Sequence, residues 1–476
     1  MVHIPVRLSG ALVLWSIAGY TLLAQQNHLA GPVERGRTVR LGTVHPGVRV
    51  GEDQGPVDPS HRLGLVTLVL KPAPAQQAAL EGLLEEQQTP SSPNYHRWLT
   101  PEEFADGFGA SQDDIARIRA WLLRQGLTVE EVARSRNWIA FSGTAEEIGR
   151  AFEIGFHRYR VEGRLHFANS SRPSVPAEFE GLVGGLSGLD DFRLAPPARP
   201  RPAFNASNGD HYLAPDDLAV IYNIAPLYRS GIDGAGQNIA IVGQTAIDLA
   251  DIRGFRGMFQ LPERDPQIVL VGPDPGITGD LAEANLDLQW AGAVARNANL
   301  IYVYSEDVMT SVRYAISQNL ASVISMSYGG CEQLMAGGSP ATLRVLAQQA
   351  NAQGITWIAS SGDNGAAGCD SVGAPAAING LAVNFPASLP EVTAVGGTRF
   401  DDAATFWSGT NGANYLSALS YLPERAWNGS GPPTGLLASG GGASMFYAKP
   451  WWQAGPGVPR DGARDVPDVA LAAAPD

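Results

Sequence analysis

The sequence predicts two domains, in which a small α+β domain precedes a larger α/β domain built on a doubly wound parallel sheet. The chain has 476 residues, enough for two or three domains of ordinary size. Hydrophobic residues make up 44% of it and charged residues 17%, which is typical of a folded chain with a sizeable core. The order of the strand and helix patterns along the chain then predicts the class of each domain.

The smaller domain is expected within residues 25–193, with its core at about 62–193. Strand patterns lie at 63–70, 138–141 and 154–159, and helix patterns at 75–87, 113–125 and 145–152. Helices interleaved with strands in this order indicate a small α+β sandwich of the ferredoxin-like kind.

The larger domain is expected over residues 212–476. Its strand patterns lie at 238–242, 267–271, 299–304, 322–327, 355–360 and 392–395, and its helix patterns at about 280–296, 308–319 and 340–352. Apolar strands that alternate with helices predict a parallel sheet covered on both faces. Functional groups of such sheets gather beyond the carboxyl ends of the strands, which here are the loops at 327–330 and 361–365.

Two segments outside the domains have their own signals. Residues 1–24 read as a signal peptide, because Arg7 precedes the apolar run 8–23 and Ala24 offers a small residue for cleavage. An uncleaved membrane anchor is the alternative, although the run is short for a membrane span. Residues 194–211 are rich in proline and predict an extended linker and processing region. We therefore expect a secreted, extracellular protein with no membrane segment in its mature form.

The net charge limits the kinds of binding partner, and the cysteine content bears on whether a disulfide forms after export. The net charge of −14 provides no basic surface for phosphate, which argues against nucleic acid as a partner. Cys331 and Cys369 are the only cysteines, and export would favour one disulfide between them. Two buried free thiols are the alternative.

The distribution of histidine restricts the chemistry of the larger domain. All eight histidines lie at or before His211. A serine–histidine–aspartate mechanism and a histidine-ligated metal are therefore excluded after that residue. Acid–base catalysis there must depend on carboxyl groups.

Glu283 and Asp287 are the first candidates for that role. They are four residues apart on a predicted helix, so both side chains point from one face. Two carboxyl groups so close share a proton, and such a pair can accept a hydroxyl proton and return it in acid. The alternative is structural: Asp280 and Glu283 can form a capping box that begins the helix, which would leave Asp287 solvated.

Two further segments could complete a site at the same edge. Asp363 follows a predicted strand between glycines, where a protonated carboxyl could donate to an oxyanion, or where it could simply be a turn residue. The segment 439–442, SGGG, could pair through its backbone with an extended peptide, or could be a plain turn.

Taken together, these segments resemble the sedolisin family of serine-carboxyl peptidases, over about residues 62–476. The segments that carry the resemblance in the larger domain are GDLAEANLDLQW (279–290), SMSYG (325–329), SGDNG (361–365), FPAS (385–388), VTAVGGT (392–398), SGGG (439–442) and PWWQ (450–453). Upstream, SPNYHRWLT (92–100) and FSGTA (141–145) are similar to the activation propeptide of the kumamolisin-like members.

The resemblance implies a subtilisin-like peptidase domain and a role for each matching residue. It makes Glu283 the general base and acid, Asp287 its orienting partner and Asp363 the carboxyl that stabilises the oxyanion. It also implies that two segments flank a bound peptide, namely Ser327, Tyr328 and Gly329, and Ser439, Gly440 and Gly441. The expected partners are a protein or peptide substrate and the chain's own propeptide, and the expected activity is that of an acid-acting endopeptidase made as a zymogen.

The sequence departs from the family at the nucleophile. The family's serine stands in a Ser-Gly-Thr-Ser turn well after the SGGG segment, and the residues after Gly442 contain no Ser-Gly pair. Ser142 and Ser408 begin similar sequences but precede the SGGG segment, and Ser444 lacks that context. We therefore expect the chain to be truncated before its nucleophile. The calcium ion that the family implies is expected to have its ligands beyond residue 476.

Two other functions remain open on the sequence alone. One is a catalytically inactive relative that binds peptides. The other is a glycoside hydrolase in which Glu283 and Asp287 form the acid pair.

Overall fold

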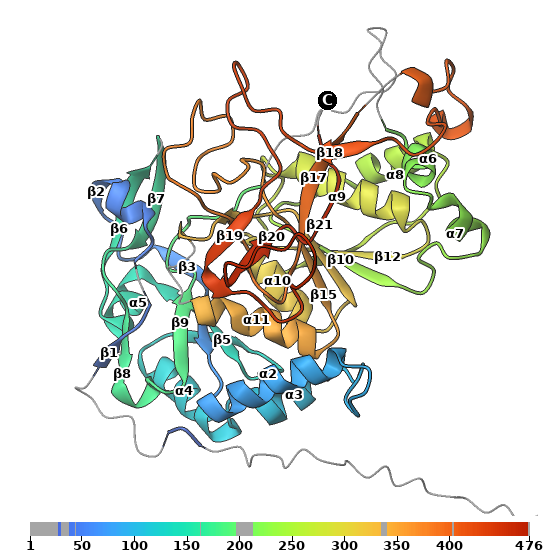
Figure 1. Ribbon diagram of the computed structural model, residues 1–476. Coiled ribbons are helices and arrows are strands. Elements are labelled where there is room, and N and C mark those ends of the chain that lie inside the picture. The colour runs from blue at the N-terminus through green and yellow to red at the C-terminus, as the bar shows by residue number, and fades with distance from the viewer. Residues whose placement is uncertain are drawn as a thin grey trace, which may run out of the picture.

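The computed structural model describes residues 27–29, 38–42, 44–161, 163–196, 213–334, 340–401 and 404–474. The predicted signal peptide and residues 197–211 of the predicted linker lie outside these ranges. Within them, no helix has the length and apolar character needed to cross a membrane. The chain forms two domains that lie side by side (Figure 1).

The smaller domain is built on a four-stranded antiparallel sheet. Its order is β4 (Thr128–Val132), β5 (Trp138–Thr144), β3 (Arg62–Leu70) and β9 (Val183–Ser187), the order of a ferredoxin-like sheet. The helices of this domain are α1 (Gly47–Val50), α2 (Pro74–Gln88), α3 (Pro101–Phe108), α4 (Gln112–Arg124) and α5 (Ala145–Phe152). Smaller sheets are formed by β2 (Glu52–Pro56), β6 (Phe156–Val161) and β7 (Arg164–Asn169), and by β1 (Thr38–Arg40) with β8 (Ser174–Pro176).

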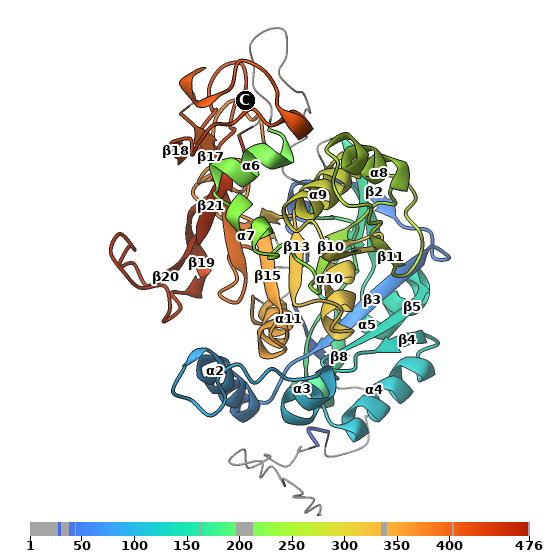
Figure 2. The ribbon, with the colours of Figure 1, turned by 90° about the vertical axis from the view of Figure 1, so that its right-hand side faces the viewer.

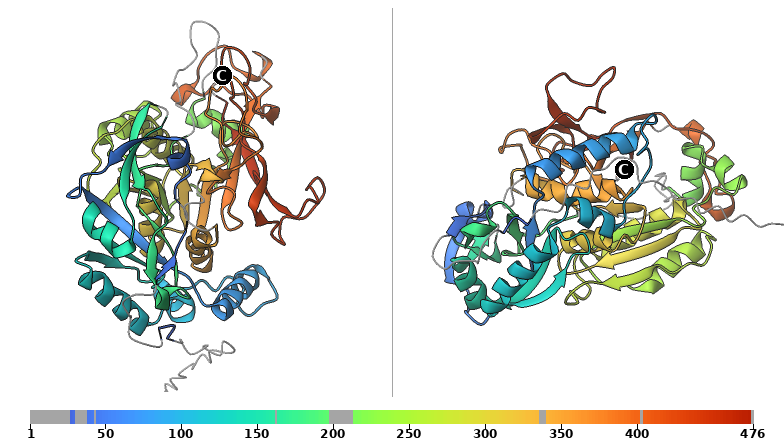
Figure 3. Two further views of the ribbon diagram at one scale, coloured as in Figure 1. Left: turned by 90° about the vertical axis from the view of Figure 1, so that its left-hand side faces the viewer. Right: turned by 90° about the horizontal axis from the view of Figure 1, so that it is seen from below.

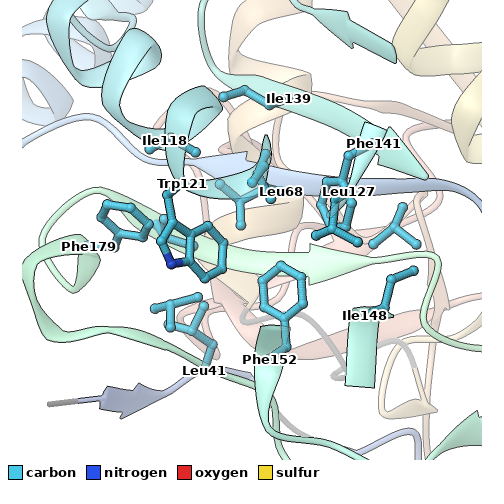
Figure 4. Close-up of a cluster of buried hydrophobic side chains, with 14 of the residues drawn as sticks. Leu41, Leu68, Ile118, Trp121, Leu127, Ile139, Phe141, Ile148, Phe152 and Phe179 are labelled. Atoms are coloured by element: carbon cyan, nitrogen blue, oxygen red, sulfur yellow. The ribbon is translucent and has the colours of Figure 1, made fainter. Parts of the chain in front are cut away.

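Aromatic side chains fill the core between this sheet and its helices (Figure 4). Trp121 of α4 contacts Phe152 of α5 and Phe179 edge to face, with ring centroids 5.4 Å apart in both pairs. Leu68 and Phe141 from the two central strands are fully buried against them. The smaller domain thus has a hydrophobic core of its own.

The larger domain contains the predicted parallel sheet (Figure 2). The parallel strands run in the order β11 (Gln267–Leu270), β12 (Asn299–Tyr304), β10 (Asn238–Gly243), β13 (Val323–Met326), β15 (Thr356–Ser360) and β17 (Thr393–Phe400). At its far edge β17 pairs with β18 (Glu424–Ala426) and β21 (Val469–Ala472). Shorter elements complete the domain: α6 (Pro215–Ile221), α7 (Ala225–Arg229), β14 (Gly330–Cys331), β16 (Asn384–Phe385), β19 (Gly442–Ala448) and β20 (Ala463–Val466).

Helices cover both faces of this sheet, as predicted. On β10, Ile239 and Ile241 pack toward α8 (Leu249–Met258) and α9 (Leu281–Val294). Ala240 and Val242 belong to the cluster formed with α10 (Val308–Ser317) and α11 (Pro340–Ala352). Because side chains alternate along a strand, this division shows that the two helix pairs lie on opposite faces.

The two domains are joined through α2 and α11, which lie alongside each other (Figures 1 and 3). Gln87 at the end of α2 is buried, and its Nε2 donates to the carbonyl oxygens of Arg97, at 2.7 Å, and Ala352, at 3.1 Å. The backbone N–H of Leu99 donates to the same Ala352 oxygen at 2.8 Å. The buried Arg313 of α10 also donates to the smaller domain, so α10 and α11 both anchor it.

Candidate active site

Glu283 occupies the first turn of α9 and is only 7% exposed. Asp280 precedes this helix, but its carboxylate makes no capping hydrogen bond and instead accepts from Gln244 Nε2 at 2.9 Å. The capping-box alternative is therefore wrong. Glu283 is a buried carboxyl group, and its pKa is raised by burial, by the charge of Asp287 and by the charge of Asp363.

Asp287 lies one turn further along α9 and is enclosed by protein. Its Oδ1 accepts a hydrogen bond from Ser327 Oγ at 2.7 Å. Its Oδ2 is buried and has no hydrogen-bond partner in the described part of the chain. Burial raises the pKa of this carboxyl as well, so Glu283 and Asp287 are a coupled pair for which two negative charges are unfavourable.

Asp363 is brought to the same place from another strand. It follows β15 in the loop at 361–365, and burial raises its pKa to about 6. Its charge contributes to the raised pKa of Glu283, so the two carboxyl groups face one common region. The structure thus brings together the three carboxyl groups that the sequence predicts, at the carboxyl edge of the sheet.

The SGGG segment runs beside the Asp363 loop. Gly440 N donates to the carbonyl oxygen of Gly362 at 2.6 Å, and Ala438 N donates to that of Asp363 at 2.7 Å. A Cβ on Gly440 would fall 2.1 Å from the carbonyl oxygen of Ser361, so only glycine allows this approach. Ser439 Oγ accepts from Gly397 N at 2.9 Å, which fixes the segment against β17.

Tyr328 and Gly329, which follow β13, lie in two different environments. Tyr328 is fully buried in the cluster with α10 and α11, so its ring does not face a substrate. Gly329 N donates to the carbonyl oxygen of Ala195 at 3.3 Å, in an antiparallel bridge. Gln244 Nε2 donates to the carbonyl oxygen of Leu194 at 2.8 Å. The start of the linker therefore lies along this edge of the sheet.

The sequence did not reveal these contacts of Gln244, Leu194 and Ala195. Gln244 directly follows β10, whose carboxyl end lies next to that of β13. A polar side chain directly after a central strand is the sequence feature from which the position of Gln244 in the site could have been predicted.

A disulfide joins Cys331 to Cys369, as predicted. Cys331 belongs to β14, which pairs with β16, and Cys369 follows the Asp363 loop. The bridge thus ties together the two loops that follow β13 and β15.

The three serines weighed as nucleophiles lie in other surroundings. Ser142 Oγ donates to Glu130 in the smaller domain. Ser408 pairs through its backbone N–H with Ser417. Ser444 Oγ donates to the buried Glu332 at 2.7 Å and accepts from two backbone N–H groups that follow it. We assign none of them as the nucleophile.

No group of three or more histidine, cysteine, aspartate or glutamate side chains that could hold a metal ion occurs among the residues that the structure describes. The described residues do not test the calcium site that the resemblance implies, and that site stays a prediction.

Comparison with known proteins identifies both domains. Residues 51–192 match the family model described as "Pro-kumamolisin, activation domain", and residues 279–445 match that of the "Subtilase family". Kumamolisin from Bacillus sp. (strain MN-32) is 30% identical over 468 residues, which cover 92% of this chain and 78% of the relative. Sedolisin from Pseudomonas sp. (strain 101) is 28% identical over 84% of this chain and 68% of its own length.

A solved structure of Pseudomonas sedolisin, described as a serine-carboxyl proteinase, is similar at 27% identity with a TM-score of 0.44, covering 55% of this chain and 70% of that one. Tripeptidyl-peptidase 1 of Rattus norvegicus is 28% identical over 78% of this chain and 69% of its length.

The fold and the matches define a peptidase domain of the subtilase kind preceded by an activation propeptide. The chain belongs to the sedolisin family of serine-type peptidases. This assignment rules out the glycoside hydrolase alternative.

Proposed function

We propose that this protein is the zymogen of an exported endopeptidase that cleaves peptide bonds in acid through a serine, with Glu283, Asp287 and Asp363 as its proton-handling groups. The observation that carries the proposal is the buried, coupled pair Glu283–Asp287 with Asp363 facing it. Residues 212–476 contain no histidine that could take their place. The disulfide supports export, because such bonds persist in oxidising compartments.

In this mechanism the carboxyl pair handles the proton of the nucleophile. Glu283 accepts the proton of the serine hydroxyl as its oxygen attacks the scissile carbonyl carbon. Protonated Asp363 donates a hydrogen bond to the oxyanion that forms. Glu283 then gives the proton to the leaving amine, which leaves an acyl-enzyme that water hydrolyses by the same route.

The start of the linker supports the zymogen part of the proposal. Ala195 pairs in antiparallel fashion with Gly329, the residue expected to flank a bound peptide. A chain segment held there would compete with substrate for the same backbone groups.

A catalytically inactive peptide-binding protein is the second candidate. One observation favours this candidate: Ala195 is bound at Gly329 through the backbone alone, and peptide binding of this kind needs no nucleophile.

Replacement of Glu283 by glutamine separates the two candidates. The test uses the natural full-length protein, with peptide hydrolysis measured between pH 3 and 8. We expect activity in acid and a loss of roughly 10²–10⁴-fold in kcat for Glu283→Gln, because an amide cannot accept the serine proton.

Glu146→Gln, at an exposed propeptide position, is the matched control. Full activity of Glu283→Gln would contradict the mechanism. Peptide binding without hydrolysis in the wild type would favour the second candidate. The 476-residue chain by itself is expected to hydrolyse no peptide, and hydrolysis abolished by Ser408→Ala would overturn our decision on that serine.

A further inference from the structure

Ser327 makes a contact that its expected role, flanking a bound peptide, does not explain. Its hydroxyl donates to Asp287 Oδ1 at 2.7 Å, from the end of β13 to the middle of α9. Its hydrogen bonding also lowers the pKa of Glu283, against the larger effects that raise it. The side chain thus acts on both carboxyl groups of the pair.

The alternation of β13 explains why Ser327 points toward α9. Ile324, Met326 and Tyr328 all belong to the cluster with α10 and α11, on one face of the sheet. The side chains between them, Ser325 and Ser327, therefore face the opposite side, which α8 and α9 cover. Because every second residue of this segment is apolar and faces α10 and α11, Ser327 faces the other side, where its hydroxyl reaches Asp287.

Among the residues that the structure describes, the other titratable groups that act on Asp287, directly or through Glu283, give it no positive charge. They are Glu283 and Asp280 on α9 or at its start, Asp363 after β15, Tyr302 on β12 and Tyr328 after β13. All five are acids, and each disfavours a second negative charge when it is ionised. Only hydrogen-bond donation can then favour the carboxylate form of Asp287, and Ser327 is the donor observed.

We propose that Ser327 is a positioning residue for the carboxyl pair, which holds Asp287 in one orientation and favours its ionised form. Since this rests on the proposed function, Ser327 acts through Asp287 and Glu283 and touches neither the nucleophile nor the scissile bond. With Asp287 held as a hydrogen-bond acceptor, the shared proton resides on Glu283 until the pair ionises fully.

The test compares the pH dependence of thermal unfolding in Ser327→Ala, Ser327→Thr and the wild-type 476-residue chain. Loss of the donor raises the folded-state pKa of Asp287. The folded variant then binds protons that the wild type has released, so its relative stability falls as pH rises. We expect the Tm difference between wild type and Ser327→Ala to grow by a few degrees from pH 4 to pH 8. Ser327→Thr retains the hydroxyl and should stay close to wild type.

Ser325→Ala is the matched control, because it removes a hydroxyl from the same face of the same strand. Its Tm difference from the wild type should not change with pH. A second measurement repeats Ser327→Ala in an Asp287→Asn background, where no carboxylate remains to be stabilised and the pH-dependent part should vanish. A Tm difference for Ser327→Ala that is the same at every pH would overturn the proposal.

Activity of the natural full-length protein distinguishes this proposal from the proposed function. Ser327→Ala should move the acid limb of the kcat/KM profile to higher pH, because the pair then releases its first proton less readily. A rise in KM alone, with an unchanged profile, would mean that Ser327 only contacts substrate. Full activity of Glu283→Gln would contradict the proposed function, whereas the unfolding measurements on the Ser327 variants would remain valid.

Discussion

At the scale of single residues, burial raises the pKa of ordinary carboxyl groups, so that they keep a proton at pH values far above their usual titration range. Asp363 shows this in its simplest form, because burial alone raises its pKa to about 6. Glu283 adds the charges of Asp287 and Asp363 to the same effect of burial. Asp363, which the proposed chemistry needs in its protonated form, therefore keeps its proton only below a pH of about 6.

Replacement of Asp363 by asparagine tests the oxyanion role. An amide still donates a hydrogen bond, but it does so at every pH. We therefore expect a smaller loss of kcat than for Glu283→Gln, and activity that extends to higher pH, since the wild type loses its donor as pH rises through about 6. The pH–rate profiles of the two enzymes decide it. An unchanged alkaline limb in Asp363→Asn would show that Asp363 does not set it.

At the scale of elements, long apolar patterns were predicted well. The bounds of β12 (Asn299–Tyr304) and α5 (Ala145–Phe152) agree with the prediction to the residue. A run of apolar side chains defines β12, and a capping box between Thr144 and Glu147 defines the start of α5. Both signals are local, so the sequence alone contains them.

Elements stabilised by distant contacts were missed. The pattern of α8 is weakened by Gly254 and Gly257, and its position depends on packing against α9. The short strands from β18 to β21 likewise depend on pairing with distant partners. In the site, the sequence identified Glu283, Asp287 and Asp363 but not the Ser327 contact, which depends on the face of β13 to which the hydroxyl points.

The disulfide should stabilise the loops that carry the site. It closes a loop of 38 residues between β14 and the segment after Asp363. In Cys331→Ser with Cys369→Ser we expect a loss of about 3 kcal/mol in the free energy of unfolding. Chemical denaturation of the variant and of wild type, both prepared without reductant, measures it. Equal stability, or two reactive thiols in denatured wild type, would contradict the prediction.

At the scale of the whole molecule, each domain contains groups whose pKa is shifted by burial, and one histidine of the propeptide has the opposite pH dependence to the carboxyl groups of the site. The folded peptidase domain binds protons at Glu283, Asp287 and Asp363 that an unfolded chain would release, so these groups favour the fold in acid. The propeptide contains a group of the opposite kind. His45 is partly buried, and burial followed by the charge of His166 lowers its pKa to about 4.

The surroundings of His45 connect it to the linker. Its ring stacks on Phe192 at 4.1 Å, and His166, paired with Asp191, stacks on the same ring at 4.4 Å. His45 Nδ1 accepts from the backbone N–H of Gly47 at 3.1 Å, which requires the neutral imidazole. Phe192 is three residues before Ala195, so this stack holds the segment that enters the active-site edge.

Protonation of His45 in acid should therefore weaken the contact between the propeptide and the start of the linker. With a folded pKa near 4 and an ordinary value of 6.5, the neutral form favours docking above pH 6.5, and this advantage is lost as pH falls toward 4. Hydrogen exchange at the Gly329 amide, corrected for its intrinsic pH dependence, reports the Ala195 contact.

Two substitutions of His45 test that account of the whole molecule. His45→Asn keeps an acceptor for Gly47 without a titrating ring, and His45→Phe keeps the stack without an acceptor. Both should flatten the pH dependence of Gly329 exchange between pH 4 and 7. His157→Asn, which removes a partly exposed histidine paired with Asp53, should leave it unchanged. If exchange in the His45 variants kept the wild-type pH dependence, the control of docking would lie in another group, such as Asp190, which accepts a hydrogen bond from Phe192 N and whose pKa burial raises to about 7.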